Sequence, residues 1–263
     1  MYILITGATD GIGKTTAIEL AKLGYNLIIH GRTSDKLINL QKTIIKDFPN
    51  IDIITIKADL SDLAETFEAF NKINNYPINV LINNAATFSK NFKYTIDGFE
   101  VTYQVNYLSH FLITHILLDN LLSNQPAKII NVSSMAHSNS INITDIKNKL
   151  FPSGYEAYSL SKLCNILFTF KLHDILKNKN ISVNCLHPGV INTKLLIDNW
   201  GPIGSDTFEG YKMIKFVFDL PIDISGKYFR NFKETKAADV VYDKFIQDEL
   251  YDITKDFLKD YIK

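Results

Sequence analysis

Short runs of β-branched and aliphatic residues alternate along this chain with longer segments of helical pattern, and this alternation constrains its fold more than any other feature. The runs cover residues 2–6, 26–30, 51–57, 78–82, 127–132 and 181–186. They are apolar enough to be buried on both faces, as strands of a parallel sheet are. The segments between them are long enough for right-handed crossover helices. The pattern predicts a single α/β domain over residues 1–263, a doubly wound parallel sheet with helices on both faces.

Charge and composition exclude several classes of protein. Lys plus Arg number 28 and Asp plus Glu number 28, so no net positive charge favours binding to nucleic acid. The two cysteines and six histidines form no disulfide framework and no metal-ligand motif, so no metal is expected. No apolar stretch approaches ~18 residues and no signal-peptide pattern follows Met1. We therefore expect a cytoplasmic protein without an integral membrane segment, for which peripheral membrane contact stays open.

The first predicted strand runs into a glycine-rich turn at residues 6–13, with the sequence TGATDGIG. Glycine permits a tight turn and a close approach of the backbone to a pyrophosphate, which the amides at a helix N-terminus then bind. The turn therefore predicts a nucleotide site of Rossmann type, although a plain strand-to-helix turn would also fit. A P-loop NTPase is a remote alternative, because Ala8-x4-Gly13-Lys14-Thr15 has Ala8 where that motif requires glycine.

The end of the second predicted strand bears on the choice of nucleotide. Folds that bind NAD place an acidic residue there, on the ribose 2′-hydroxyl. This chain has Arg32 instead, and a guanidinium can pair bidentately with the 2′-phosphate of NADP. The sequence thus favours NADP(H) over NAD(H), with a solvated surface arginine as the plainer interpretation.

Tyr158 and Lys162 lie four residues apart in a segment of helical pattern that runs to about residue 177. They share a helix face, so the ammonium can stabilise the phenolate and lower the pKa of Tyr158 from about 10 toward working pH. Two other Tyr–Lys pairs have this spacing, so context decides between them. Only Tyr158 lies between a strand ending in NVSS and one ending in HPG, at the sheet edge where ligands bind. Tyr158 is therefore our candidate acid/base.

With these motifs in order, the chain resembles the short-chain dehydrogenase/reductase family over nearly its whole length. The motifs that carry the resemblance are TGxxxGIG at 6–13, Asp59-Leu60, NNAA at 83–86, Asn106, Ser134, Tyr158-x3-Lys162 and Pro188-Gly189. The family implies an oxidoreductase that transfers hydride between NADP(H) and a small carbonyl or alcohol substrate, in a homodimer or homotetramer. Both hydroxyls, of Ser134 and Tyr158, suit the alkoxide character that develops on the substrate oxygen.

The resemblance also implies a role for each residue. Tyr158 would donate or accept the proton, Lys162 would lower its pKa and hold the nicotinamide ribose, and Ser134 would hydrogen-bond the carbonyl. Asn106 would hold a water in the proton relay. Asp59 would meet the adenine, Asn83 the adenine-side ribose, and Thr193 the carboxamide. The implied cofactor-binding residues are Gly7, Thr9, Asp10, Gly11, Ile12, Gly13, Arg32, Asp59, Leu60, Asn83, Ala85, Tyr158, Lys162, Pro188, Gly189, Val190 and Thr193.

Two departures from the family pattern are visible. Ala86 replaces the last glycine of the Asn-Asn-Ala-Gly pattern, and the separation of Ser134 from Tyr158 is longer than usual. The longer separation, with SHFL at 109–112, SKLCNILF at 161–168 and GKYF at 226–229, is similar to the retinol dehydrogenase-like branch. That branch implies NADP and apolar substrates such as aldehydes, ketones and retinoids. The insertion leaves open whether Ser133 or Ser134 faces the substrate.

The chain after residue 186 loses the strand–helix rhythm and becomes rich in Pro, Gly and aromatic residues. We expect a loop and a helix, about 190–225, that close as a lid over an apolar substrate. The aromatic residues of 200–218 could instead pack on the sheet or form an interface. Residues 236–263 predict a closing amphipathic helix.

A different class of function also stays open. A catalytically weak NADP-binding regulator could share this fold, because a fold does not guarantee a function. The intact set Asn106, Ser134, Tyr158 and Lys162 favours an enzyme.

Overall fold

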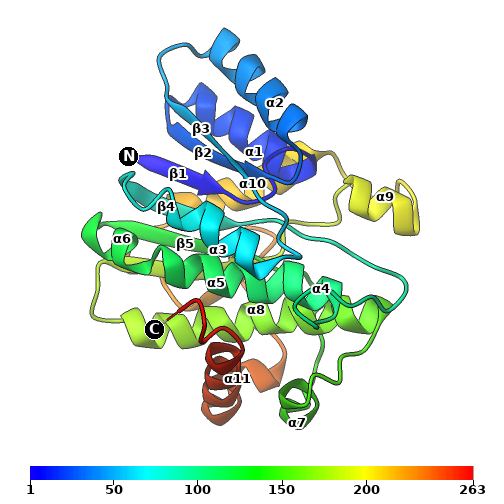
Figure 1. Ribbon diagram of the computed structural model, residues 1–263. Coiled ribbons are helices and arrows are strands. Elements are labelled where there is room, and N and C mark those ends of the chain that lie inside the picture. The colour runs from blue at the N-terminus through cyan, green and yellow to red at the C-terminus, as the bar shows by residue number, and fades with distance from the viewer. Residues whose placement is uncertain (263) are drawn as a thin grey trace.

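The computed structural model describes residues 1–262, arranged around one eight-stranded sheet (Figure 1). The strand order is β3-β2-β1-β4-β5-β6-β7-β8, parallel except for β8, which runs antiparallel to β7. The strands are β1 (Tyr2–Ile5), β2 (Asn26–Gly31), β3 (Ile53–Lys57), β4 (Ile78–Asn83), β5 (Ala127–Val132), β6 (Ile181–Leu186), β7 (Lys227–Arg230) and β8 (Lys233–Glu234). The chain winds outward in both directions from β1, so the predicted doubly wound fold is confirmed.

Strands β7 and β8, at the edge of the sheet, are not among the strands predicted from the sequence. β7 has four residues, with Lys and Arg at its ends, and only Tyr228 and Phe229 are buried. So short a run carries too little periodicity to be recognised as a strand. β8 has two exposed residues and is defined only by its pairing with β7.

Helices cover both faces of the sheet. The helices are α1 (Gly11–Lys22), α2 (Ser34–Asp47), α3 (Leu63–Asn71), α4 (Val101–Tyr103), α5 (Ser109–Ile116), α6 (Leu118–Ser123), α7 (Ile143–Lys147), α8 (Gly154–Leu176), α9 (Lys194–Trp200), α10 (Thr207–Asp219) and α11 (Lys244–Phe257), with a π-helical turn at Gln104–Leu108 and a 3-10 turn at Asp239–Tyr242. None of the helices within residues 1–262 combines the length and apolarity needed to cross a membrane.

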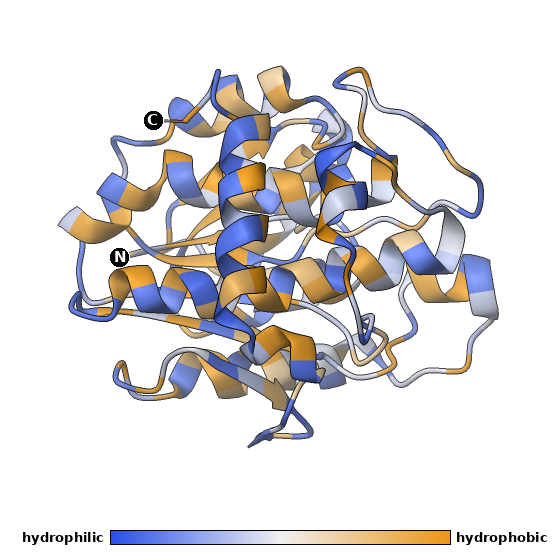
Figure 2. Cartoon of the chain, turned by 90° about the horizontal axis from the view of Figure 1, so that it is seen from below, coloured by the Kyte–Doolittle hydropathy of each residue, from blue (hydrophilic) through white to orange (hydrophobic). Residues whose placement is uncertain are grey.

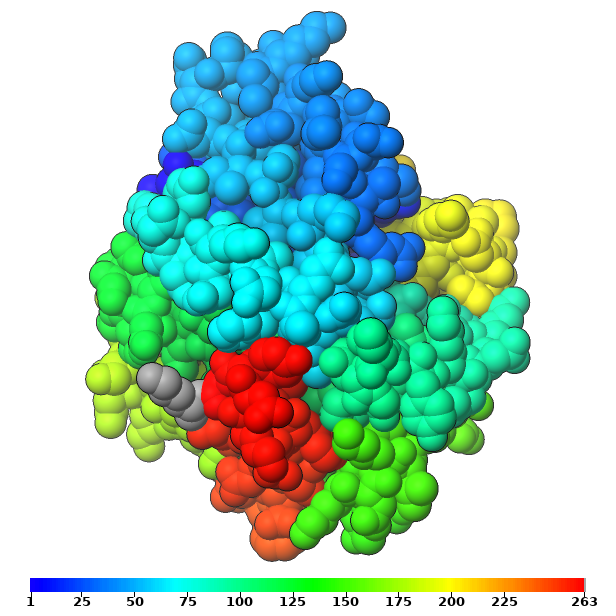
Figure 3. Space-filling view, viewed as in Figure 1, coloured from blue at the N-terminus to red at the C-terminus, as the bar shows by residue number. Residues whose placement is uncertain are grey.

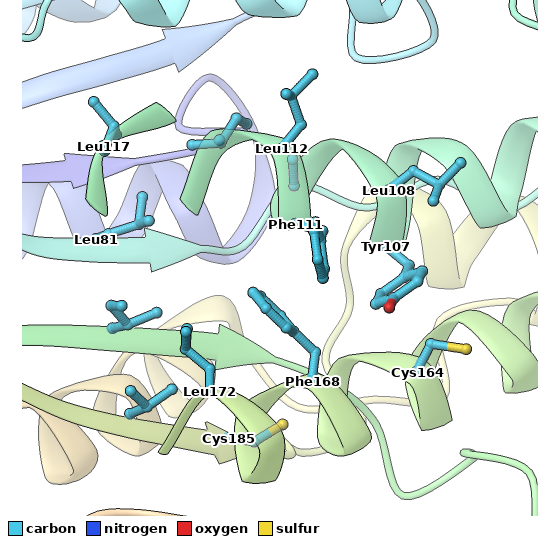
Figure 4. Packing of buried hydrophobic residues seen from close by; sticks show 14 of the residues in the cluster. Leu81, Tyr107, Leu108, Phe111, Leu112, Leu117, Cys164, Phe168, Leu172 and Cys185 are labelled. Carbon is cyan, nitrogen blue, oxygen red and sulfur yellow. The ribbon is translucent and has the colours of Figure 1, made fainter. Parts of the chain in front are cut away.

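Alternation along the strands divides the core into two clusters. Ile3 and Ile5 of β1 face α1, α2 and α10, whereas Leu4 faces α3, α5 and α8. On the second face Phe111 of α5 meets Phe168 of α8, with ring centroids 4.7 Å apart (Figure 4). Many helices in Figure 2 are banded with hydrophilic and hydrophobic residues, as expected when one side is buried and the other meets solvent.

The predicted lid at 190–225 is wrong in its second half. Helix α10 belongs to the core, where its Met213, Ile214 and Val217 pack in the same cluster as β1 and α1. A Cβ at Gly210 would lie 2.8 Å from Ile12 of α1, so the two helices are in close contact there. The apolar residues of α10 form the buried face of an amphipathic helix. Helix α9, in contrast, has no buried residue and projects from the body of the molecule (yellow in Figure 3).

The predicted closing helix is shorter than expected. α11 begins after Asp243, whose Oδ1 accepts hydrogen bonds from Phe245 N and Ile246 N, at 2.9 and 3.3 Å. This cap satisfies two amides of the first turn and sets the helix start. The residues before it form a loop and the 3-10 turn.

Candidate active site

A cleft of about 900 Å³ lies at the carboxyl ends of the central strands, where ligands bind in open α/β sheets. Seventeen of the site residues predicted from sequence line it: Gly7, Thr9, Asp10, Gly11, Ile12, Gly13, Arg32, Asp59, Leu60, Ala85, Ser134, Tyr158, Lys162, Pro188, Gly189, Val190 and Thr193. The two that do not are Asn83 and Asn106. The tertiary structure thus brings together residues from the whole chain.

The glycine turn forms one wall of this cleft, and its close contacts leave no room for side chains. A Cβ on Gly13 would lie 2.3 Å from the carbonyl oxygen of Gly7, and one on Gly7 would lie 2.8 Å from Ala85 Cα. Gly7 also has a left-handed φ of +66°. The turn leads directly into α1, whose N-terminal amides suit an anion such as a pyrophosphate. The cradle therefore fits a dinucleotide.

The P-loop alternative fails on the positions of its two polar residues. Lys14 is exposed on α1 and does not line the cleft. The Thr15 hydroxyl donates a hydrogen bond to Thr207 Oγ1 of α10, at 2.8 Å. Neither side chain is placed to bind a phosphate at the turn.

The end of the cleft next to β2 carries two cations. Arg32 is exposed there, and Lys36 of α2 also lines the cleft. Lys36 Nζ lies 3.7 Å from Asp10 Oδ2. Lys36 is not among the residues predicted from the sequence, although its spacing of four residues from Arg32 was a usable signal. Two cations here can neutralise a phosphate that a single exposed arginine would bind weakly.

Tyr158 and Lys162 lie deep in the cleft on α8. Lys162 Nζ is 5.6 Å from the centre of the Tyr158 ring and donates a hydrogen bond to Val132 O, at 2.9 Å. An ammonium has three donors, so two remain for a ligand. Burial lowers the pKa of Lys162 to about 8.

The expected direction of the Tyr158 pKa shift is wrong for this structure. Burial raises the pKa of Tyr158 to about 12, and the neighbouring Ser134 hydroxyl lowers it only in part. Desolvation of the phenolate is the largest cause of this shift. Tyr158 is a neutral proton donor at physiological pH.

The two serines after β5 have different tasks. The Ser133 hydroxyl is buried and donates to the carbonyl oxygen of Lys162, at 2.7 Å. The Ser134 hydroxyl lines the cleft and accepts a hydrogen bond from Ala136 N, at 3.1 Å. The Ser134 hydroxyl can still donate its proton, so of the two serines it is the one available to a ligand of the cleft.

Asn106 does not line the cleft, and its side chain makes structural hydrogen bonds. Its Oδ1 accepts from Thr87 N at 2.7 Å, and its Nδ2 donates to Thr87 O and Ser161 Oγ. These bonds occupy the amide, so the side chain positions the loop after β4 and the start of α8. Asn106 is thus a positioning residue through its side chain, and its predicted role in holding a water of the proton relay stays a prediction.

The predicted contact of Asn83 with the adenine-side ribose is corrected, because Asn83 does not line the cleft. It is the last residue of β4, and its Nδ2 donates to Thr114 Oγ1 and Asn131 Oδ1, at 3.1 and 2.9 Å in the core. The next residue, Asn84, lines the cleft and its Nδ2 donates to Thr6 O, at 2.9 Å. Alternation at the end of the strand decides which of the two asparagines faces a ligand.

The end of the cleft beyond Tyr158 is built from large side chains, of which only Trp200 falls in the lid predicted from the sequence. Phe88 lies edge-on to Tyr158 at 5.9 Å between ring centroids, and its centroid is 4.7 Å from that of Trp200. Met135 and Tyr155 complete this wall. They come from separate loops and helices, and no local pattern groups them.

Comparison with known proteins agrees with this geometry. The family model described as short chain dehydrogenase matches residues 1–200. Retinol dehydrogenase 13 of mouse is 33% identical over 272 residues, which cover 95% of this chain and 81% of that protein. Bovine retinol dehydrogenase 12 is 34% identical over 275 residues, covering 97% and 85%. Human polyprenol dehydrogenase is 32% identical over 274 residues, covering 94% and 82%.

Solved structures share the fold. An uncharacterised protein from Mycobacterium paratuberculosis superposes with a TM-score of 0.79 and 26% identity, covering 98% of this chain and 93% of that one. L-Sorbose reductase from Gluconobacter frateurii, solved with NADPH and L-sorbose, superposes with a TM-score of 0.70 and 19% identity, covering 87% and 93%. The latter likeness concerns the fold alone.

Proposed function

Because the chain belongs to the short-chain dehydrogenase family, and is thereby an oxidoreductase acting on CH–OH groups, we propose that it transfers hydride between NADP(H) and an apolar aldehyde, ketone or alcohol. One observation carries the proposal. Tyr158, Ser134 and Lys162 lie in one cleft, between the glycine turn on one side and an aromatic wall on the other.

The residues of the cleft divide the chemistry among them. The nicotinamide, when bound, supplies or takes up the hydride. Ser134 and Tyr158 donate hydrogen bonds to the substrate oxygen, and Tyr158 transfers its proton as negative charge develops there. The Lys162 ammonium stabilises the resulting phenolate, which recovers a proton from solvent. In the opposite direction a Tyr158 phenolate, stabilised by the Lys162 ammonium, takes the proton of the alcohol.

The preference for NADP(H) is supported by the two cations at the β2 end. The glycine turn, Asp59, Lys162 and residues 188–193 would hold the rest of the dinucleotide. Arg32 and Lys36 would bind the 2′-phosphate, which NAD lacks. The test compares kcat/KM for NADPH and NADH with one substrate, and equal values would contradict the proposed preference.

The apolar substrate is supported by the wall of Phe88, Met135 and Trp200, and by relatives whose names refer to retinol and polyprenol. Each buried methylene contributes roughly 0.8 kcal/mol. We therefore expect kcat/KM for straight-chain aldehydes to rise by about tenfold for each added pair of methylenes that is fully buried, and by several-fold where burial is partial. The reaction is followed as the oxidation of NADPH. A flat or falling series would exclude an apolar pocket, and no turnover of any aldehyde, ketone or quinone would favour a binding protein.

A further inference from the structure

We propose that His30 is a positioning residue for the dinucleotide, whose imidazole ties the glycine turn to the loop that forms the facing wall of the cleft. His30 lies near the end of β2 and is 3% exposed at the floor of the cleft. Its Nδ1 accepts a hydrogen bond from Gly7 N at 3.2 Å, and its Nε2 lies 3.1 Å from Ala58 O. The inference rests on the proposed function in taking a dinucleotide as the ligand of this cleft.

The two partners determine the protonation of the ring. The Gly7 amide can only donate, so Nδ1 carries no proton, and the Ala58 carbonyl can only accept, so Nε2 carries one. The imidazole is therefore neutral in the folded protein. Burial lowers the pKa of His30 to about 4, although Asp59 and Glu65 act in the opposite direction. The ring of Phe70 packs against it, with centroids 5.3 Å apart.

The topology explains why this tie has to come from β2. The order β3-β2-β1 places β2 between the strand that precedes Gly7 and the strand that precedes Ala58. Only a residue at the carboxyl end of β2 is adjacent to both loops. Main-chain bonds join β2 to each loop separately, from Ala8 N to His30 O at 2.8 Å and from Ala58 N to Gly31 O at 3.3 Å. The imidazole adds one rigid group that spans both.

Each end of the bridge precedes residues that contact the ligand. Gly7 begins the turn that approaches the pyrophosphate, and Ala58 is followed by Asp59 and Leu60, which line the cleft. A loose bridge would leave the partly buried Gly7 amide without its partner and let the two walls move apart. Tyr158 and Ser134 lie on α8 and after β5, away from this bridge. Loss of the bridge should therefore weaken dinucleotide binding and leave the chemical step intact.

Three variants separate the two hydrogen bonds. His30→Asn places an amide oxygen near the position of Nδ1 and keeps an acceptor for Gly7, but cannot reach Ala58. His30→Gln places an amide nitrogen near the position of Nε2 and keeps a donor for Ala58, but loses the acceptor for Gly7. His30→Leu removes both. The matched control is His115→Leu, because His115 is a partly buried histidine whose two ring nitrogens have partners, Phe111 O and Tyr251 Oη, both at 2.8 Å.

The measurements are the Kd for NADPH and for adenosine 2′,5′-bisphosphate by calorimetry, kcat at saturating NADPH, and the thermal unfolding midpoint. We expect each lost bond to raise both Kd values by about 2- to 10-fold, with His30→Leu weaker than either amide variant. The kcat at saturation should stay within about twofold of wild type, because no transition-state contact is removed. His115→Leu should lower the unfolding midpoint without changing either Kd.

The outcomes also separate this inference from the proposed function. Wild-type protein that binds neither ligand would contradict the proposed function itself. Wild-type protein that binds both, with unchanged Kd values in folded His30→Asn and His30→Gln, would overturn only the role of His30. An equal rise of Kd in His115→Leu would also overturn it, because general loosening of the core would then explain the effect.

Discussion

The two ends of the cleft are built from different material. At the dinucleotide end the glycine turn is a wall of backbone, with contacts that leave no room for a Cβ. Buried polar side chains such as His30 and Thr6 hold it in place. The Thr6 hydroxyl accepts hydrogen bonds from Asn84 N and Ala85 N. At the substrate end the walls are side chains that stay partly exposed: Met135 is 44% exposed, Tyr155 55% and Trp200 40%. A change at the first end should therefore affect every substrate alike, and a change at the second should affect one substrate more than another.

The largest effect is expected where the two ends meet. Tyr158→Phe removes the acid/base hydroxyl but keeps the ring that packs on Phe88. We expect kcat to fall by about 10²–10⁴-fold, with the Kd for NADPH nearly unchanged. Steady-state kinetics and a fluorescence titration of NADPH measure the two quantities. A variant with more than about a tenth of wild-type kcat would remove Tyr158 from the mechanism.

The next effect tests the backbone wall. Gly13→Ala places a methyl group 2.3 Å from Gly7 O, so the turn has to open. Such overpacking costs about 1–3 kcal/mol, and because the dinucleotide needs the closed turn we expect a rise in the NADPH Kd of about 5- to 150-fold. The loss of kcat/KM for NADPH should be the same whether turnover is measured with a short or with a long aldehyde.

Gly24→Ala is the matched control for this variant. Gly24 follows α1 with a φ of +81°, and a Cβ added to it would have no other atom within 4 Å. It should lose stability through backbone strain alone and keep its affinity for NADPH. Equal loss of affinity in both variants would show that the effect comes from α1 as a whole and not from the turn.

Cofactor choice should change by a similar or smaller factor. Arg32→Asp replaces a phosphate partner by a repelling charge at the exposed end of the cleft. A charge-assisted hydrogen bond contributes roughly 1.5–3 kcal/mol, so the preference for NADPH over NADH should fall by about 10- to 100-fold in ratios of kcat/KM. Lys36→Gln should shift the ratio in the same direction by less. An unchanged ratio in Arg32→Asp would show that the 2′-phosphate is not bound there.

The smallest effect separates the two halves of the aromatic segment 200–218. Trp200 and Phe208 are equally exposed, at 40% and 41%, but only Trp200 lines the cleft. Loss of ~50 Å² of apolar contact corresponds to ~1.3 kcal/mol, so Trp200→Ala should lower kcat/KM for a long-chain aldehyde by about tenfold and for a short one by less. Phe208→Ala should leave both values unchanged. Equal effects of the two substitutions would show that Phe208 also contacts the substrate, as the lid predicted over 190–225 requires.

Sequence reasoning succeeded where a side chain or its absence acts through its neighbours in the chain. The strands of the sheet, the glycine turn and the Tyr158–Lys162 pair all depend on spacing within one or two elements. It failed where two adjacent residues of the same type compete for one position, as Asn83 and Asn84 do. The alternation of a strand sends one side chain to the core and the next to the cleft, and the sequence does not say at which residue the strand ends.

The sequence by itself therefore determined the doubly wound parallel sheet, the glycine-rich turn and the pairing of Tyr158 with Lys162 on one helix, because periodicity and local spacing are properties of the chain. Only the tertiary structure decided that α10 packs in the core while α9 borders the cleft, since both helices carry apolar residues and burial depends on what they meet. The same holds for the raised pKa of Tyr158, which is set by the desolvation around the hydroxyl and not by the lysine four residues away. The bridge at His30 exists because β2 lies between β1 and β3, a neighbourhood that no stretch of the sequence contains.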